Sequence, residues 1–164
     1  MELSKNRYIG DIVLKRKPER GSYLNDIPAV KYLMGAGHIE LNAPVTFFIG
    51  ENGTGKSTLL EAIAVAAGFN PEGGTKNFSF STRDTHSELC GCISLVRYGY
   101  PKDGFFLRAE SFYNVASNID ELDEAGGLGP QIKDSYGGKS LHAQSHGESF
   151  FSLVQNRFGG RGLY

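Results

Sequence analysis

One eight-residue segment constrains this chain more than any other: Gly50-Glu51-Asn52-Gly53-Thr54-Gly55-Lys56-Ser57. It fits the pattern G-x-x-x-x-G-K-[ST] and has the context that the pattern requires. The continuous apolar run of residues 45–49 precedes it, as is typical of a strand buried on both faces. Residues 56–67 follow with apolar residues at helical spacing, and Gly68 is placed to end that helix. The segment therefore predicts a phosphate-binding loop between a buried strand and a helix.

The residue types of this segment suit an anion. We expect Gly50, Gly53 and Gly55 to take positive φ angles, so that successive N–H groups converge on one phosphate. The helix that follows adds about half a positive charge at its N-terminus. Lys56 supplies a mobile cation for β- and γ-phosphates, and the Ser57 hydroxyl is a ligand for Mg²⁺. The predicted binding residues are Gly50, Glu51, Asn52, Gly53, Thr54, Gly55, Lys56, Ser57 and Thr58. The alternative is a glycine-rich turn that binds nothing.

Extended to Thr58-Leu59-Leu60-Glu61-Ala62-Ile63, the segment resembles the ABC-type P-loop ATPase superfamily. It is closer to the SMC- and RecF-like branch, described as AAA family ATPases, than to kinases or small GTPases. The resemblance implies an α/β fold: a P-loop NTPase core, here incomplete, with an antiparallel β subdomain and a helical insertion. It also implies ATP and Mg²⁺ as cofactors, and ATP hydrolysis by a nucleotide-dependent, head-to-tail homodimer.

A second segment gains meaning from this resemblance: Gln144-Ser145-His146-Gly147-Glu148. In the family, a Ser-x-Gly-[Gln/Glu] signature opens a helix and faces the γ-phosphate held by the opposite subunit. Ser145, Gly147 and Glu148 fit that pattern, whereas Gln144 stands where the family usually has Leu. The same residues also fit a capping box, which would serve only the stability of the helix. The two interpretations are compatible in the absence of nucleotide.

The acidic residues of a hydrolytic P-loop enzyme have no clear counterpart here. Such an enzyme needs a carboxylate at the end of an apolar strand to hold Mg²⁺ and orient water. The nearest candidate, Asp120, lies in a helical pattern, and Glu110 or Ser111 is a weak positional substitute. Residues 160–164 resemble the start of the strand that carries these acids, the Walker B strand. We therefore expect an N-terminal portion of a larger ATPase or a truncated reading frame, with no catalytic residue of its own, which hydrolyses ATP negligibly.

The rest of the chain divides into four parts by pattern. Residues 1–68 form the β subdomain with the loop and its helix, and 69–122 form β hairpins and a helix. Residues 123–144 hold five of the 22 glycines and read as a flexible loop, and 145–164 form the signature helix and the start of the Walker B strand. The expected strands are 7–15, 38–41, 45–49, 77–82, 89–98 and 105–110, with a hairpin turn at 100–104, and the expected helices are 56–67, 111–122 and 145–158.

Composition limits the partners. Lys and Arg total 17 against 18 Asp and Glu, for a net charge of −1, so a DNA partner is open through the family but unsupported by charge. No apolar run approaches the roughly 20 residues that span a bilayer, and we expect a cytoplasmic protein. Cys90 and Cys92 are expected on one strand face as reduced core thiols. His38, His86, His142 and His146 are expected to be surface or loop residues rather than metal ligands.

Several alternatives remain open at this stage. The first is a nucleotide-dependent switch or binding module that associates on ATP without turnover. The others are a P-loop kinase and the ATP-binding subunit of an ABC transporter. Tyr23 and Tyr32 are equal candidates for stacking on adenine. The basic run Lys15-Arg16-Lys17 with Arg20 reads as a solvated strand end, with phosphate contact as the alternative.

Overall fold

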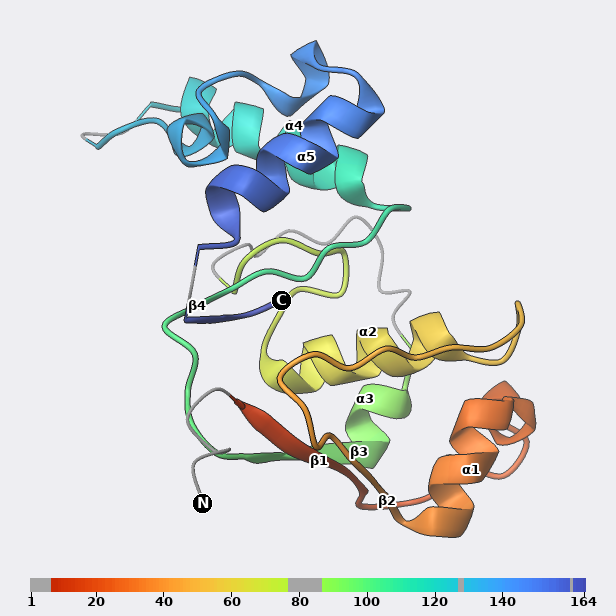
Figure 1. The fold of residues 1–164 in the computed structure, drawn as a ribbon. Coiled ribbons are helices and arrows are strands. Elements are labelled where there is room, and N and C mark those ends of the chain that lie inside the picture. Colours follow the sequence, from red (N-terminus) through yellow and green to blue (C-terminus); the bar gives the residue numbers. More distant parts are fainter. Residues whose placement is uncertain (1–6, 77–86, 127–128, 160) are drawn as a thin grey trace.

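The computed structural model describes residues 7–76, 87–126, 129–159 and 161–164. Figure 1 shows a lower part with the small sheet and the first helices, and an upper part built from the C-terminal helices. Within the described ranges the elements follow in the order β1 (Ile9–Leu14), η1 (Tyr23–Asp26), α1 (Pro28–Ala36), β2 (His38–Glu40), α2 (Lys56–Ala67), α3 (Leu89–Cys92), β3 (Ile93–Arg97), β4 (Asp103–Gly104), α4 (Phe112–Glu124), η2 (Ile132–Tyr136), η3 (Leu141–Ala143), α5 (His146–Arg157) and β5 (Gly162–Leu163).

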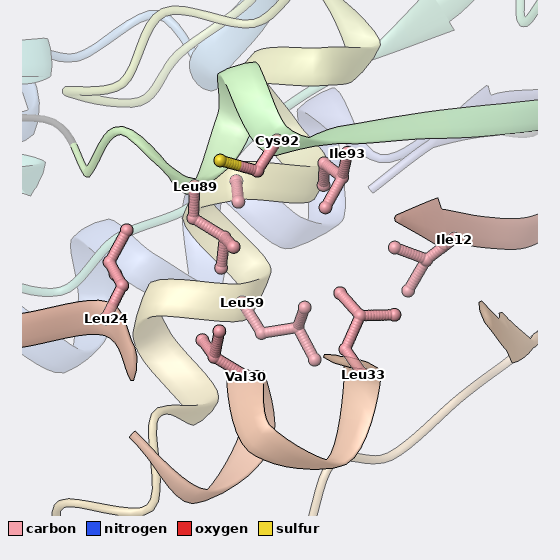
Figure 2. Close-up of a cluster of buried hydrophobic side chains, with 9 residues drawn as sticks. Ile12, Leu24, Val30, Leu33, Leu59, Leu89, Cys92 and Ile93 are labelled. Carbon is pink, nitrogen blue, oxygen red and sulfur yellow. The ribbon is translucent and has the colours of Figure 1, made fainter. Parts of the chain in front are cut away.

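The expected antiparallel β subdomain is a sheet of order β2-β1-β3. Ile12 of β1 stands opposite Ile39 on one side and Leu95 on the other. Because side chains alternate along a strand, this register sends one face of β1 toward the helices. Figure 2 shows the resulting first core, whose buried members are Ile12, Leu24, Val30, Leu33, Leu59, Ala62, Leu89, Cys92 and Ile93. Each large apolar side chain buried there contributes about 1.5–3 kcal/mol.

Helix α2 has the predicted bounds. It runs from Lys56 to Ala67 and ends at Gly68, which takes the left-handed conformation with φ 95°. The Gly68 N–H donates to the carbonyls of Ala64 and Val65, as a glycine C-cap does.

Helix α1 was not expected from the pattern. Pro28 occupies its first turn, where a missing N–H costs nothing, and Gly37 ends it with φ 78°. Val30 and Leu33 are fully buried against the sheet and α2. The signals were present in the sequence as a Pro at the start and a Gly at the end of a short apolar stretch.

The prediction of a buried strand over 45–49 was wrong. The segment has no strand conformation, and Val45, Phe47 and Ile49 are 66%, 80% and 92% exposed. Only Phe48 packs partly against the first core. An apolar run becomes a strand only where neighbouring backbone groups pair with it. Within the described ranges, no strand pairs with this segment.

The predicted strands at 89–98 and 105–110, with a hairpin between them, were also corrected. Residues 89–92 form the short helix α3, so Cys90 and Cys92 do not share a strand face, although both are free thiols. Only 93–97 is a strand, and it pairs with β1. Over 105–110 the described pairing is a single bridge from Phe106 to Gly74, while β4 pairs in parallel with β5. The predicted strand 77–82 lies outside the described residues.

The upper part has its own core. The predicted helices at 111–122 and 145–158 are confirmed as α4 and α5. The region 123–144 is not simply a loop, because η2 and η3 form there and bury Tyr136 and Leu141. The buried members of this second core are Phe105, Phe112, Val115, Ala116, Ile119, Tyr136, Leu141 and Leu153.

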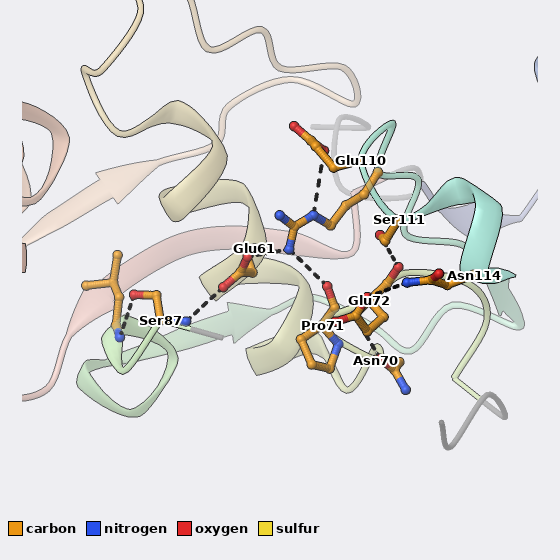
Figure 3. A network of polar contacts seen from close by, with 10 residues as sticks. Glu61, Asn70, Pro71, Glu72, Ser87, Glu110, Ser111 and Asn114 are labelled. Carbon is orange, nitrogen blue, oxygen red and sulfur yellow. Dashed lines mark hydrogen bonds and ion pairs between the residues drawn. The ribbon is translucent and has the colours of Figure 1, made fainter. Parts of the chain in front are cut away.

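A small apolar cluster and a polar network connect the two parts. Ala64, Ala67 and Phe69 form the cluster, against which Phe106 and Leu163 pack. Figure 3 shows the network, in which Arg108 donates to the Glu61 carboxylate and to the Pro71 carbonyl. Ser111 and Asn114 donate to the backbone and side chain of Glu72. Among the helices that the structure describes, none is long and apolar enough to cross a membrane.

Candidate functional site: a phosphate loop at the start of helix α2

Residues 50–55 form a loop that is exposed over 50–53 and leads directly into α2. Gly53 and Gly55 have φ angles of 83° and 93°, in the left-handed region that favours glycine. Gly50 was expected to share this conformation, and that expectation was wrong, because its φ is not positive. Two of the three glycines therefore carry the backbone reversal of the loop.

The Lys56 side chain folds back over this loop. Its ammonium donates to the carbonyl oxygens of Gly50 and Glu51, at 2.8 and 2.7 Å. The Thr54 hydroxyl donates to the Glu51 carbonyl at 2.8 Å, which ties the two ends of the loop together. The cation is thus held over the loop by backbone oxygens, in a loop that already has a defined shape.

The backbone N–H groups at the start of α2 have no hydrogen-bond partner among the described residues. The N-cap Gly55 makes no side-chain cap, and the first turn carries no acidic residue. The N–H groups of this first turn therefore have no helical partner and, with the helix dipole, favour an anion. The Ser57 side chain is exposed beside them, while Thr58 is half buried. The Ser57 hydroxyl oxygen is of the ligand type that Mg²⁺ takes in proteins.

The N-terminus of α1 braces the loop from behind. The Ala29 N–H donates to the Thr54 carbonyl at 3.0 Å. A Cβ atom added at Gly55 would lie 2.1 Å from Cγ2 of Ile27, so a side chain there is excluded by packing as well as by φ. Sequence reasoning missed Ile27 and Ala29 because the contact joins positions about 25 residues apart. The only local signal was Pro28, which marks the start of a helix.

Ser145 and Glu148 form a complete capping box at the start of α5. The Glu148 N–H donates to Ser145 Oγ at 3.4 Å, and the Ser145 N–H donates to Glu148 Oε2 at 2.9 Å. The hydrogen bonds from the Ser145 side chain and backbone hold the pKa of Glu148 below its ordinary value. Of the two interpretations of this segment, the capping box is present in the structure.

Gly147 has no role in this cap. It is exposed, and a Cβ atom added there would meet nothing within 4 Å. The fold therefore does not require a glycine at this position. Because glycine has no side chain, it leaves the start of the helix uncovered at this position.

The two candidate anion sites lie in different parts of the molecule. Figure 1 shows α5 in the upper part and α2 in the lower part, with segments 69–76 and 103–111 between them. Helix α5, whose N-cap is Ser145, therefore lies apart from α2 within one chain.

The remaining candidates have other contacts. His142 lies 3.0 Å from the Ser117 hydroxyl, and the His146 ring packs against Phe150, so the two histidines do not form a pair. Tyr23 and Tyr32 are both largely exposed. The two carboxylates considered as substitutes for the Walker B acid also have partners. Arg108 pairs with Glu110 at 3.8 Å, and the Ser140 hydroxyl donates to Asp120 at 2.6 Å. In the basic run, Arg16 donates to the Gly91 carbonyl.

Comparison with protein families adds one finding to this geometry. A model described as an AAA domain matches residues 30–100. The matched stretch resembles an AAA domain. It contains most of α1, the loop 50–55, α2 and β3, but covers less than half of the chain and excludes Ser145. No curated protein and no solved structure matches the chain. The match supports a P-loop ATPase-like family, and with it nucleotide binding and ATPase-type activity in general terms.

Proposed function

We propose that this chain binds ATP with Mg²⁺ through residues 50–58, as the nucleotide-binding part of an ATPase. The observation that carries the proposal is the braced loop at the open start of α2, with the Lys56 ammonium above it. The AAA domain match over the same residues supports it.

Each residue has a distinct task in this proposal. The backbone N–H groups that follow Gly53 and Gly55 bind the phosphate oxygens, because their left-handed geometry turns them toward one point. Lys56 exchanges the carbonyls of Gly50 and Glu51 for the β- and γ-phosphates, where a charge-assisted hydrogen bond is stronger. Ser57 Oγ would ligate Mg²⁺, which neutralises phosphate charge when bound.

We further propose that ATP is hydrolysed in the complete protein by a head-to-tail dimer of the SMC- and RecF-like type. In that dimer Ser145, Gly147 and Glu148 of one subunit face the nucleotide bound by the other. The separation of α5 from α2 within one chain and the unobstructed Gly147 support an arrangement in trans. The net charge of −1 gives no support to DNA as a partner.

The decisive experiment is ATP titration by calorimetry with the Lys56→Ala variant. Loss of the ammonium should weaken binding by more than about tenfold, since hydrogen bonds between charged groups contribute about 1.5–3 kcal/mol. Lys31→Ala is the matched control, because Lys31 is an exposed lysine paired only with Asp26 among the described residues. Equal affinity of Lys56→Ala and wild type would exclude the loop as the nucleotide site.

A further inference from the structure

Three side chains of types that commonly bind metals lie close together on the solvent-facing side of the sheet, away from the phosphate loop. Asp11 of β1 stands opposite Glu40 of β2, and His38 lies two residues before Glu40 on the same face. One ligand atom from each of the three residues lies within 4.8 Å of the others. Ile12 and Ile39, at the alternate positions, pack in the first core. The face that carries the three polar residues is therefore fixed by burial of the opposite face.

No described residue outside this group forms an ion pair with Asp11 or Glu40. Asp11 and Glu40 are like charges directly opposite each other, an arrangement that destabilises an antiparallel pair. Within the described residues Asp11 makes no ion pair or side-chain hydrogen bond, and Glu40 makes an ion pair only with His38, at 3.6 Å. Neutral histidine leaves two negative charges side by side. A bound cation would remove this repulsion.

A second layer of contacts orients the group. Asn42 donates to Glu40 Oε2 at 3.0 Å, which leaves Oε1 turned toward His38. Arg7 in turn donates to the Leu41 carbonyl and to Asn42 Oδ1, at 3.1 and 3.4 Å. Metal-ligating carboxylates are commonly held by hydrogen bonds of this kind. Ligands that project from paired strands are also positioned more precisely than ligands on loops.

We propose that Asp11, His38 and Glu40 bind one divalent transition-metal ion of the Zn²⁺ type. An imidazole with two carboxylates suits Zn²⁺ and its neighbours, whereas Mg²⁺ and Ca²⁺ prefer oxygen ligands alone. The side chains of His38 and Glu40 are 50% and 58% exposed, so water completes the coordination. The ion links β1 to β2. It thereby ties together the two ends of the connection formed by residues 15–37, which includes α1. This inference does not depend on nucleotide binding.

Calorimetric titration of the 164-residue chain with Zn²⁺, in reducing buffer without nucleotide, tests the proposal. One ion should bind per chain. Asp11→Asn and His38→Gln should each weaken binding by at least about tenfold, and Asn42→Ala, which keeps all three ligands, by about 10–100-fold. His142→Gln and Cys90→Ser are matched controls, because they remove competing ligand types elsewhere; their affinity should equal that of wild type.

A spectroscopic measurement covers the case in which a ligand variant does not fold. Co²⁺ added to the wild-type chain should give a spectrum without thiolate charge transfer, and should shift and broaden the NMR signals of the His38 ring. Absence of Zn²⁺ binding would overturn the proposal. So would binding that is lost in Cys90→Ser or His142→Gln but kept in Asp11→Asn, or unperturbed His38 signals in the presence of Co²⁺.

Discussion

Arg108 and Glu61 form an ion pair across 47 positions of sequence, and this pair joins helix α2 to the segment that leads into α4. The Glu61 side chain is only 12% exposed and that of Arg108 27%. The second carboxylate oxygen of Glu61 accepts the Ser87 N–H at 2.9 Å. A single carboxylate on α2 thus contacts two segments that follow it in the chain.

We predict that Arg108→Ala lowers the free energy of unfolding by about 1–3 kcal/mol, because it leaves the largely buried Glu61 carboxylate without its cation. The loss should appear in urea denaturation monitored by circular dichroism. Lys31→Ala is the control, since the Lys31–Asp26 pair is exposed and worth at most about 1 kcal/mol. An Arg108→Ala variant as stable as Lys31→Ala would show that the pair does not hold the parts together.

The contacts of Asp103 predict that the stability of the fold decreases in acid. Burial tends to raise the pKa of Asp103, but the hydrogen bonds from Arg157, at 2.6 and 2.9 Å, outweigh it and leave the pKa below the ordinary 3.8. A depressed pKa in the folded state contributes stability above the unfolded pKa, and this is lost as pH falls through the folded pKa.

We therefore expect Asp103→Asn to be less stable than wild type at about pH 7, with a difference that shrinks below about pH 4. Urea denaturation at a series of pH values measures both effects. Asp26→Asn serves as the exposed control. It should change neither the stability at about pH 7 nor the dependence of stability on pH. A stability difference that is constant down to about pH 2 would contradict the ion pair.

Ser145→Asp separates the cap of α5 from a signature in trans. Asp is as good an N-cap as Ser, but it loses the hydrogen bond that the Ser145 hydroxyl donates to Glu148 Oε2, so stability should fall by no more than about 1 kcal/mol. Its negative charge would repel a γ-phosphate, so dimerisation with a non-hydrolysable ATP analogue should be lost in light scattering. Gly147→Ala should likewise prevent dimerisation. It should not lower the stability of the monomer, because the new Cβ atom meets nothing there. ATP binding by the monomer should be unaffected in both variants, and unchanged dimerisation would leave Ser145 only as a cap.

The exposed apolar side chains of segment 45–49 predict self-association. Phe47 and Ile49 are 80% and 92% exposed, and apolar surface of this kind promotes association. The double variant Phe47→Thr, Ile49→Thr should reduce the sedimentation-derived mass at high concentration, with a stability change below about 0.5 kcal/mol. A large loss of stability would instead show that these side chains are covered in solution.

Local signals in the sequence were sufficient for some elements. Helix α2 has its predicted bounds because the lysine that begins it and Gly68 that ends it are both local determinants. The cap of α5 was predictable for the same reason, since Ser145 and Glu148 lie three residues apart. The left-handed conformations of Gly53 and Gly55 followed from the loop pattern.

Other elements depend on distant contacts that a single sequence does not reveal. Residues 89–92 alternate like a strand but turn into α3 after Ser87, whose hydroxyl accepts the Leu89 N–H and whose own N–H is held by Glu61, 26 positions earlier. The proposed metal ligands on the sheet also come together through a distant contact. Asp11 meets His38 and Glu40 only through the register of β1 with β2.

The small cluster of Ala64, Ala67 and Phe69 has a consequence for cooperativity. Two of its three buried members are alanines, so it joins the two larger cores through little apolar area. Regions coupled this weakly open separately in hydrogen exchange, as distinct foldons. Amides of α4 and α5 should therefore exchange through a partial unfolding that leaves β1 and α2 protected. The helix that carries Ser145 can then lose its order while the phosphate loop keeps its shape.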